Sequence, residues 1–164
     1  MACRGVHFAI SSTDADRLLA APTPDEVLRI IQEDIEEKWD DEWLYQTDKA
    51  WDAIHRCLTD GTLDPNAGVY PLKLAILNGR RIDAGPNYII SLTTPIAARD
   101  VASSLASIDR AWFQNRYNAI EQHDYGQPKS EQDLEYTWDW FKGLDALFRK
   151  AADAQRHVIF TVDQ

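Results

Sequence analysis

Short apolar runs typical of strands alternate along the chain with stretches in which apolar residues recur at helical spacing. This pattern divides the chain into short strands and amphipathic helices. Runs of β-branched and aromatic residues predict strands at residues 3–10, 42–47, 86–92 and 156–162. Apolar residues that recur every three or four positions predict helices at residues 11–20, 23–38, 48–60, 94–108, 109–120 and 130–154. The run YPLKLAILNG, residues 70–79, fits a helical turn as well as a strand.

The start of the second helix has a strong local signal. Thr23 can accept a hydrogen bond as the N-cap, Pro24 suits the first helical position, and Glu26 completes a T-x-x-E capping box. Apolar residues then recur at helical spacing and predict one buried face: Val27, Ile30, Ile31 and Ile35.

Strands at both ends and in the middle of the chain, joined by helical segments, predict a single α+β domain over residues 1–164. We expect a small mixed or antiparallel sheet that packs on one face against several helices. No composition shift, long linker or internal repeat divides the sequence.

The sequence is strongly acidic, with a formal net charge of −10 at pH 7. This sign repels phosphate backbones and anionic membranes, so we expect neither nucleic acid nor a membrane as a partner. No apolar run approaches the roughly 18 residues of a membrane span, and the polar N-terminal region lacks a signal-peptide pattern. A soluble, cytoplasmic protein is therefore expected.

The acidic residues are concentrated in the segment EDIEEKWDDE, residues 33–42, which holds seven of them and one lysine. Trp39 and Trp43 lie inside or beside it, and aromatic anchors among like charges are one way to bind a basic partner. The pattern also fits a solvated helix end whose tryptophans point inward. The candidates for partner binding are Glu33, Glu36, Glu37, Asp40, Asp41, Glu42 and Trp43.

The stretch DKAWDAIHRCLTDG, residues 48–61, concentrates side chains that bind metals or move protons. On a helix, Asp52 and Arg56 form an exposed i, i+4 ion pair, and Gly61 suits a left-handed helix stop. The residues that fall on one apolar stripe are Trp51, Ile54, His55 and Leu58.

His55 on this stripe needs a hydrogen-bond partner when it is buried, so it is either a structural histidine or a residue that lines a pocket. A zinc site is not expected, because Trp51 and Thr59 occupy the positions one turn before and after it. Cys57 projects about 200° away from His55 on a helix, so the two cannot form a thiolate–imidazole pair.

One distant residue can partner this histidine. Asp145 lies between Phe141 and Phe148 on an apolar stripe, and a buried carboxylate there needs a donor such as His55, His7 or an arginine. An aspartate at the rim of a helix is the simpler alternative. The pocket candidates are Trp51, His55 and Asp145.

Other chemical signatures are missing from the sequence. Cys3 and Cys57 lack disulfide-framework or zinc spacing, and the glycines form no phosphate loop or nucleophile elbow. Arg80 and Arg81 can hold an anion, although a solvated loop is the simpler interpretation. We expect neither a metal nor a cofactor.

Three features together resemble one known family: Gly5 in the first strand, the helix of residues 48–61, and the run YIISLTTPIAARDVASSLASI. In the helix the matching residues are Lys49, Trp51, His55, Leu58, Thr59 and Gly61. These features are similar to the YfbM-like family (DUF1877), a bacterial domain of unknown function. The chain departs from the pattern at Asp60 and in its enlarged acidic segment. The resemblance implies a single α+β domain and carries over no activity, cofactor or catalytic residue.

Two functional hypotheses follow. The first is a cytoplasmic, non-enzymatic protein-binding domain whose acidic surface engages a basic protein, as an immunity or antitoxin-like factor does. The alternative is a small-molecule-binding protein or an enzyme with a pocket lined by Trp51 and His55.

Overall fold

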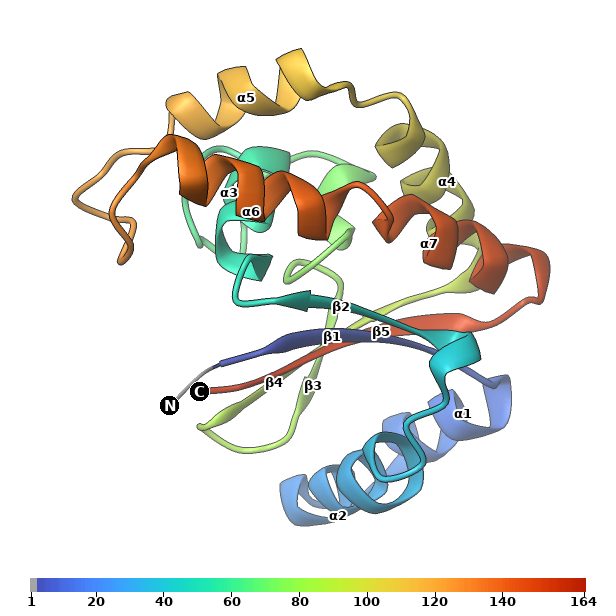
Figure 1. Cartoon of the computed structure of the whole chain (residues 1–164). Coiled ribbons are helices and arrows are strands. Elements are labelled where there is room, and N and C mark those ends of the chain that lie inside the picture. The colour runs from blue at the N-terminus through green and yellow to red at the C-terminus, as the bar shows by residue number, and fades with distance from the viewer. Residues whose placement is uncertain (1–2) are drawn as a thin grey trace.

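A central antiparallel sheet organises the computed structural model, which describes residues 3–164 (Figure 1). Within this part of the chain five strands form one sheet in the order β2-β1-β5-β4-β3, and all neighbouring strands are antiparallel. The strands are β1 (Gly5–Ile10), β2 (Leu44–Asp48), β3 (Arg80–Asp83), β4 (Tyr88–Thr93) and β5 (His157–Asp163). The predicted single α+β domain is confirmed, and of the two expected kinds of sheet, mixed or antiparallel, the structure has the antiparallel one.

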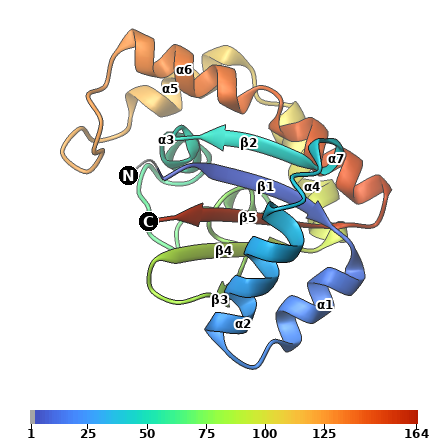
Figure 2. The same ribbon diagram turned by 60° about the horizontal axis from the view of Figure 1, so that its bottom comes forward.

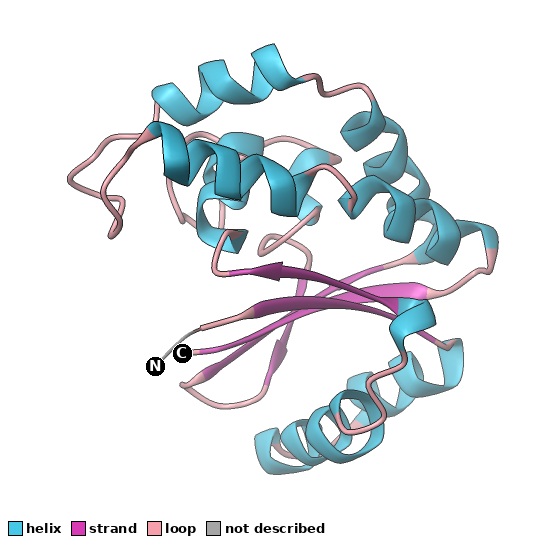
Figure 3. Ribbon diagram, viewed as in Figure 1, coloured by secondary structure: helices cyan, strands magenta, loops and turns pink. Residues whose placement is uncertain are grey.

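Helices cover both faces of this sheet (Figures 1 and 3). On one face lie α1 (Ser12–Ala20) and α2 (Pro24–Arg29), and α2 continues as the π-helical segment η1 (Ile30–Glu36). On the other face lie α3 (Trp51–Leu58), α4 (Pro95–Ala106), α5 (Arg110–Asn118), α6 (Glu131–Phe141) and α7 (Leu144–Asp153). Short 3₁₀ turns are η2 (Asp41–Trp43) and η3 (Leu72–Leu74). Figure 2 shows α1 and α2 lying across the strands.

The prediction that helices pack on only one face of the sheet was wrong. Every residue of β1 and of β4 is buried, as expected of strands that are covered on both sides. Alternate residues of β1 enter different cores: Phe8 and Ile10 pack under α1 and α2, and Ala9 packs under the larger helical layer. The sheet therefore separates two hydrophobic cores.

The strand β3 corrects the prediction of a solvated loop at Arg80 and Arg81. It pairs with β4, from Arg80 opposite Leu92 to Asp83 opposite Ile89. Of its four residues only Ile82 is buried, so the strand carries too few apolar residues to stand out in the sequence. In the ambiguous run before it, residues 72–74 form the 3₁₀ turn η3.

The predicted helix starts at Thr23 and Ser130 are confirmed, because each side chain accepts a hydrogen bond from the backbone three residues later. The single helix predicted over residues 130–154 is instead divided into α6 and α7 at Gly143. Tyr45 of β2 causes this break: its hydroxyl donates to the Trp140 carbonyl at 2.7 Å and accepts from the Gly143 amide at 3.2 Å.

Gly143→Ala should lower the free energy of unfolding by about 1 to 3 kcal/mol, because an added Cβ would lie 2.8 Å from the Tyr45 ring. Gly126→Ala is the matched control, since nothing lies within 4 Å of the Cβ it adds. Chemical denaturation measures both variants. Equal stability of the two would contradict the proposed role of Tyr45 in dividing the helix.

Candidate functional site

The acidic segment, residues 33–42, begins with carboxylates that are already paired. Asp34 lies 2.6 Å from the Arg17 guanidinium, and Glu33 lies 3.3 Å from Arg29. The hydrogen bond from Arg17 holds the pKa of the Asp34 carboxyl below its usual range. Both ion pairs lie within the lower helical layer, which consists of α1, α2 and η1. The charges of these two acids are therefore neutralised inside the domain.

Glu36 points toward the sheet and is only partly exposed. Its carboxylate accepts hydrogen bonds from the hydroxyls of Tyr88 in β4 and Thr161 in β5, the latter at 3.2 Å. Burial, together with this carboxylate, raises the pKa of the Tyr88 phenol. Glu36 therefore anchors the end of η1 to the sheet.

Glu42 and Trp43 attach the end of the segment to α7. The Lys150 ammonium donates to the Glu42 carbonyl at 2.6 Å and lies 4.4 Å from the centre of the Trp43 ring. The Arg156 guanidinium lies 3.8 Å from the same ring centre. Cation–π contacts of this kind contribute about 0.5 to 2 kcal/mol each. Trp43 is therefore half-buried between two cations, and its ring already has partners.

Residues 37–41 all remain exposed. We call the aromatic residue and the three acids among them the Trp39 surface: Glu37, Trp39, Asp40 and Asp41. The fifth residue, Lys38, puts one positive charge beside them. None of the three carboxylates forms an ion pair with any described residue. Asp40 accepts a hydrogen bond from the Glu42 amide at 3.2 Å, which begins the turn η2. The partner-binding candidates of the sequence thus separate into paired acids and this open group.

Trp39 has a backbone conformation that a bulky residue rarely adopts. Its φ is +42°, in the left-handed region, where a side chain with a Cβ costs about 1 to 2 kcal/mol. Its side chain is 40% exposed and touches Phe8 edge-on, with 5.9 Å between ring centres. Glycine or asparagine would make this turn at lower cost. The candidates chosen from the sequence include Trp43 and omit Trp39, whereas the structure exposes Trp39 and covers Trp43 with two cations. The backbone turn that exposes Trp39 leaves no signal in the sequence pattern.

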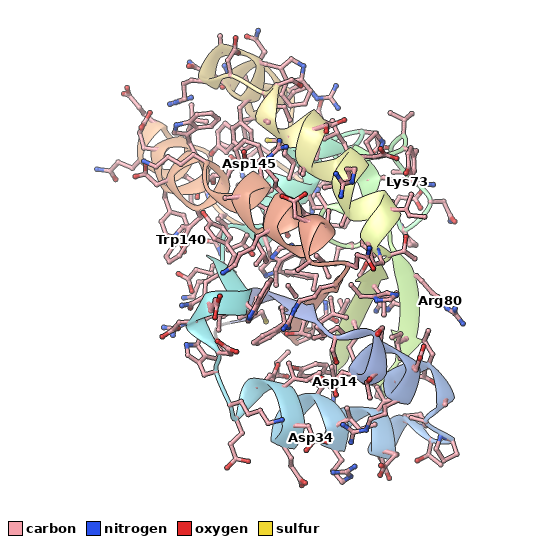
Figure 4. All side chains as sticks on the ribbon, turned by 90° about the vertical axis from the view of Figure 1, so that its right-hand side faces the viewer. Asp14, Asp34, Lys73, Arg80, Trp140 and Asp145 are labelled. Atoms are coloured by element: carbon pink, nitrogen blue, oxygen red, sulfur yellow. The ribbon has the colours of Figure 1, made fainter. Side chains whose placement is uncertain are left out.

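A hollow of about 250 Å³ adjoins this surface. Apolar side chains of β1 and η1 line it, including Phe8 and Ile35, together with the Trp43 ring. Three carboxylates and two cations also line it: Asp14, Asp34, Asp40, Lys38 and Arg156. Figure 4 shows Asp14 and Asp34 together on the lower helical layer, far from Asp145 in α7.

The structure places Trp51, His55 and Asp145 in three different surroundings. Trp51 donates from its indole nitrogen to the Cys3 carbonyl at 3.0 Å and lines a hollow of about 240 Å³ with Tyr125. His55 is 1% exposed and lines neither this hollow nor the one beside Asp145. Asp145 is half-buried in a separate hollow of about 180 Å³. The pocket predicted from these three residues therefore has no common cavity.

His55 faces the core, as the stripe on its helix predicted. No described residue forms a hydrogen bond with its Nε2 atom, and burial lowers its pKa to about 4, assisted by the positive charge of Arg56. His7 on β1 is fully buried, and its Nε2 donates a hydrogen bond to the Ala75 carbonyl at 2.7 Å. Burial lowers its pKa to about 4 as well. Both rings are therefore neutral at pH 7.

Arg56 corrects the prediction of an exposed Asp52–Arg56 pair. The pair forms at 2.6 Å, but the Arg56 residue is only 4% exposed. Its guanidinium also donates to the carbonyls of Gly61 and Asp124, at 3.2 and 2.9 Å. Loop residues 121–126 cover it, and this distant contact is invisible to helical periodicity.

Gly61 has a φ of +93° and stops α3 as predicted. Beyond Arg56, a second arginine satisfies carbonyl oxygens at this helix end: Arg116 of α5 donates to the carbonyls of Cys57 and Thr59. The end of α3 is thus held by cations, which the negative end of a helix favours. Within the described part of the chain, no three histidine, cysteine, aspartate or glutamate residues are grouped to hold a metal ion.

Arg56→Lys should lower the free energy of unfolding by about 2 to 4 kcal/mol, since an ammonium cannot replace a guanidinium that bonds three separate oxygens. Hydrogen exchange should accelerate in residues 121–126, which Arg56 holds to α3. Lys142→Arg, at an exposed ion pair with Asp139, is the control and should be neutral. Unchanged exchange in the loop would contradict this role.

Stability should fall as the pH drops from 6.5 toward 4, because the unfolded chain then binds protons that buried His7 and His55 do not. At pH 5 each buried histidine should lower the free energy of unfolding by about 2 kcal/mol relative to neutral pH. His55→Leu should reduce the loss of unfolding free energy measured between pH 7.5 and 5, and His123→Leu, in an exposed loop, should not. If the unfolding free energy of the wild type and of His55→Leu changed equally with pH, the conclusion that burial lowers the pKa of His55 would be wrong.

The fold and this surface define a class of protein: an α+β domain whose antiparallel sheet has helices on both faces and whose acidic segment, residues 33–42, exposes a tryptophan. The chain belongs to the DUF1877 family, a domain of unknown function, whose model matches residues 1–161. A similar solved structure is the protein of unknown function YfbM from Escherichia coli, with a TM-score of 0.69 and 19% identity. The match covers 97% of this chain and 99% of YfbM, so the two share a fold.

No curated protein matched the sequence. Among the described residues, no helix is both long and apolar enough to cross a membrane.

Proposed function

We propose that this domain binds a basic protein partner through the Trp39 surface, without catalysing a reaction. The observation that supports this proposal is the exposed, left-handed Trp39 among three carboxylates that lack ion-pair partners in the described chain. Backbone strain of this kind persists where the surrounding structure holds it, and it is concentrated at functional sites.

The neighbouring contacts give this surface a rigid base. Glu36 is bonded to the sheet on one side of Trp39, and Glu42 and Trp43 are bonded to α7 on the other side. A fixed surface loses little conformational entropy on binding. Because these acids already have partners, the free negative charge of the segment is concentrated on Glu37, Asp40 and Asp41, with the exposed Lys38 offsetting one of the three charges.

The adjoining hollow can receive the stem of a basic side chain. The methylenes of a lysine or arginine can pack against Phe8 and Ile35, while its charge pairs with Asp40, the lining carboxylate that has no ion-pair partner among the described residues. Lys38 and Arg156 also line the hollow and oppose deeper entry of a cation. Aromatic anchors supply much of the binding energy at such interfaces, and complementary charge accelerates association. One role that fits this surface is to cover a basic partner protein, as an immunity or antitoxin-like protein does.

Selection of a random peptide display library on the immobilised chain tests the proposal. We expect enrichment of peptides rich in lysine and arginine with an apolar neighbour. Binding of a selected peptide should weaken about thirtyfold in Glu37→Lys/Asp41→Lys, and similarly in Trp39→Ala, as expected when a central anchor is lost. Fluorescence titration measures both effects.

The control variant is Glu131→Lys/Asp139→Lys, which makes the same change in net charge on exposed acids of α6. It should bind the selected peptide as tightly as the wild type does. Trp39→Ala should also cost less stability than Trp51→Ala, which loses about 3 to 5 kcal/mol because Trp51 is only 7% exposed. Peptides without a basic bias, or equal weakening in the α6 control, would rule out the proposed surface.

A further inference from the structure

The two edges of the sheet differ in how they are covered. At the β2 edge, Tyr45 bonds to the backbone between α6 and α7, and Tyr136 of α6 donates to Asp48 at 2.5 Å. Helices α6 and α7 both contact β2, so this edge lies under the helical layer. At the β3 edge, the structure shows a contact with α2 on one face, and in Figure 4 Arg80 points outward from the strand.

The open edge has unpaired charges. Arg80 and Arg81 are exposed, and neither forms an ion pair with any residue in the described range 3–164. Asp83 is exposed as well, and one of its oxygens accepts from the Gly85 amide at 3.0 Å. Arg81 and Asp83 are two residues apart and lie on the same face of the strand.

From this edge we propose that a second copy of the chain pairs with β3, antiparallel and about a two-fold axis through Ile82. In an antiparallel pair, opposite residues share a face, so this register places Arg81 of each copy opposite Asp83 of the other. The strand is therefore complementary in charge to itself, and the same pair forms twice. The Ile82 side chains lie on the opposite face, where each is already buried under α2.

The proposed register also keeps the Arg80 side chains of the two copies apart. Arg80 lies on the same face as Ile82 and, in this register, stands opposite the small residue Ala84 of the second copy. No two arginines face each other directly. An exposed edge strand is a template for another strand, and β3 is short, so we expect a weak dimer that forms at high concentration. This inference does not depend on the Trp39 surface.

Sedimentation velocity of the full chain, at about 0.15 M salt and over a wide range of concentrations, measures the association. The mass should rise from 18.7 kDa toward twice that value. Arg81→Asp puts like charges opposite each other in both pairs, and Asp83→Arg does the same with the opposite sign. Each variant should raise the dissociation constant about tenfold or more.

A mixture of these two variants tests whether the pairing of residue 81 with residue 83, rather than the net charge, controls association. The Arg81→Asp chain then offers two acids and the Asp83→Arg chain two arginines, so an equimolar mixture should form a heterodimer at least as stable as the wild-type dimer. Arg149→Asp, at an exposed position of α7, is the charge-matched control and should leave association unchanged. Thermal unfolding verifies that each variant is folded.

Three results would overturn the proposal. The first is a wild-type chain that stays monomeric up to its solubility limit. The second is a dimer that neither single variant weakens, and the third is a mixture of the two variants that fails to associate.

Discussion

Burial of the sheet on both faces is the constraint on which the rest of the structure depends. The central strands have apolar side chains on alternate faces, so each face needs its own helical cover. The chain must therefore leave the lower layer after η1 and reach the far edge of the sheet at β2. Residues 37–43 make this crossing, and the crossing explains the left-handed backbone of Trp39, the turn η2 and the attachment of Trp43 to α7.

The same constraint explains the buried histidines. A polar residue on a strand or helix between two layers cannot reach solvent, so it must find a partner or remain neutral. His7 bonds to the backbone of the long segment between α3 and β3, and thereby helps to hold that segment against the sheet. His55 lies on α3, which is buried on nearly every side. His55, the main catalytic candidate of the sequence, therefore belongs to the helical core.

The sequence was sufficient for features that depend on neighbouring residues. Thr23 and Ser130 begin helices and Gly61 ends one as predicted, because caps and stops are local chemistry. Features that depend on distant residues were missed. Gly143 breaks a helix because of Tyr45, and Arg56 is buried because a loop nearly seventy residues later covers it.

The candidate site was partly predictable for the same reason. Composition located the acidic segment, but only the fold separates Glu36, which bonds to the sheet, from Glu37, which stays exposed. The choice between Trp39 and Trp43 likewise depends on cations of α7 and of the segment that follows it. The helices of residues 11–20 and 23–38 were predicted, but the face of the sheet that they cover was not, because the side on which a helix packs is set by the fold. The nearly continuous apolar runs of β1 and β4 were the available signal of burial on both faces.

The two proposed surfaces lie at opposite edges of the sheet, since residues 37–43 lead into β2 and the dimer forms at β3. Figure 4 shows this separation, with the cyan crossing segment and the green edge strand on opposite sides of the molecule. Pairing through β3 would therefore leave both Trp39 surfaces free and directed outward. Two linked surfaces can bind a partner with repeated basic sites more tightly than either surface alone, because the second contact becomes intramolecular. A weak edge-strand dimer would then strengthen an acidic binding surface without altering any residue in it.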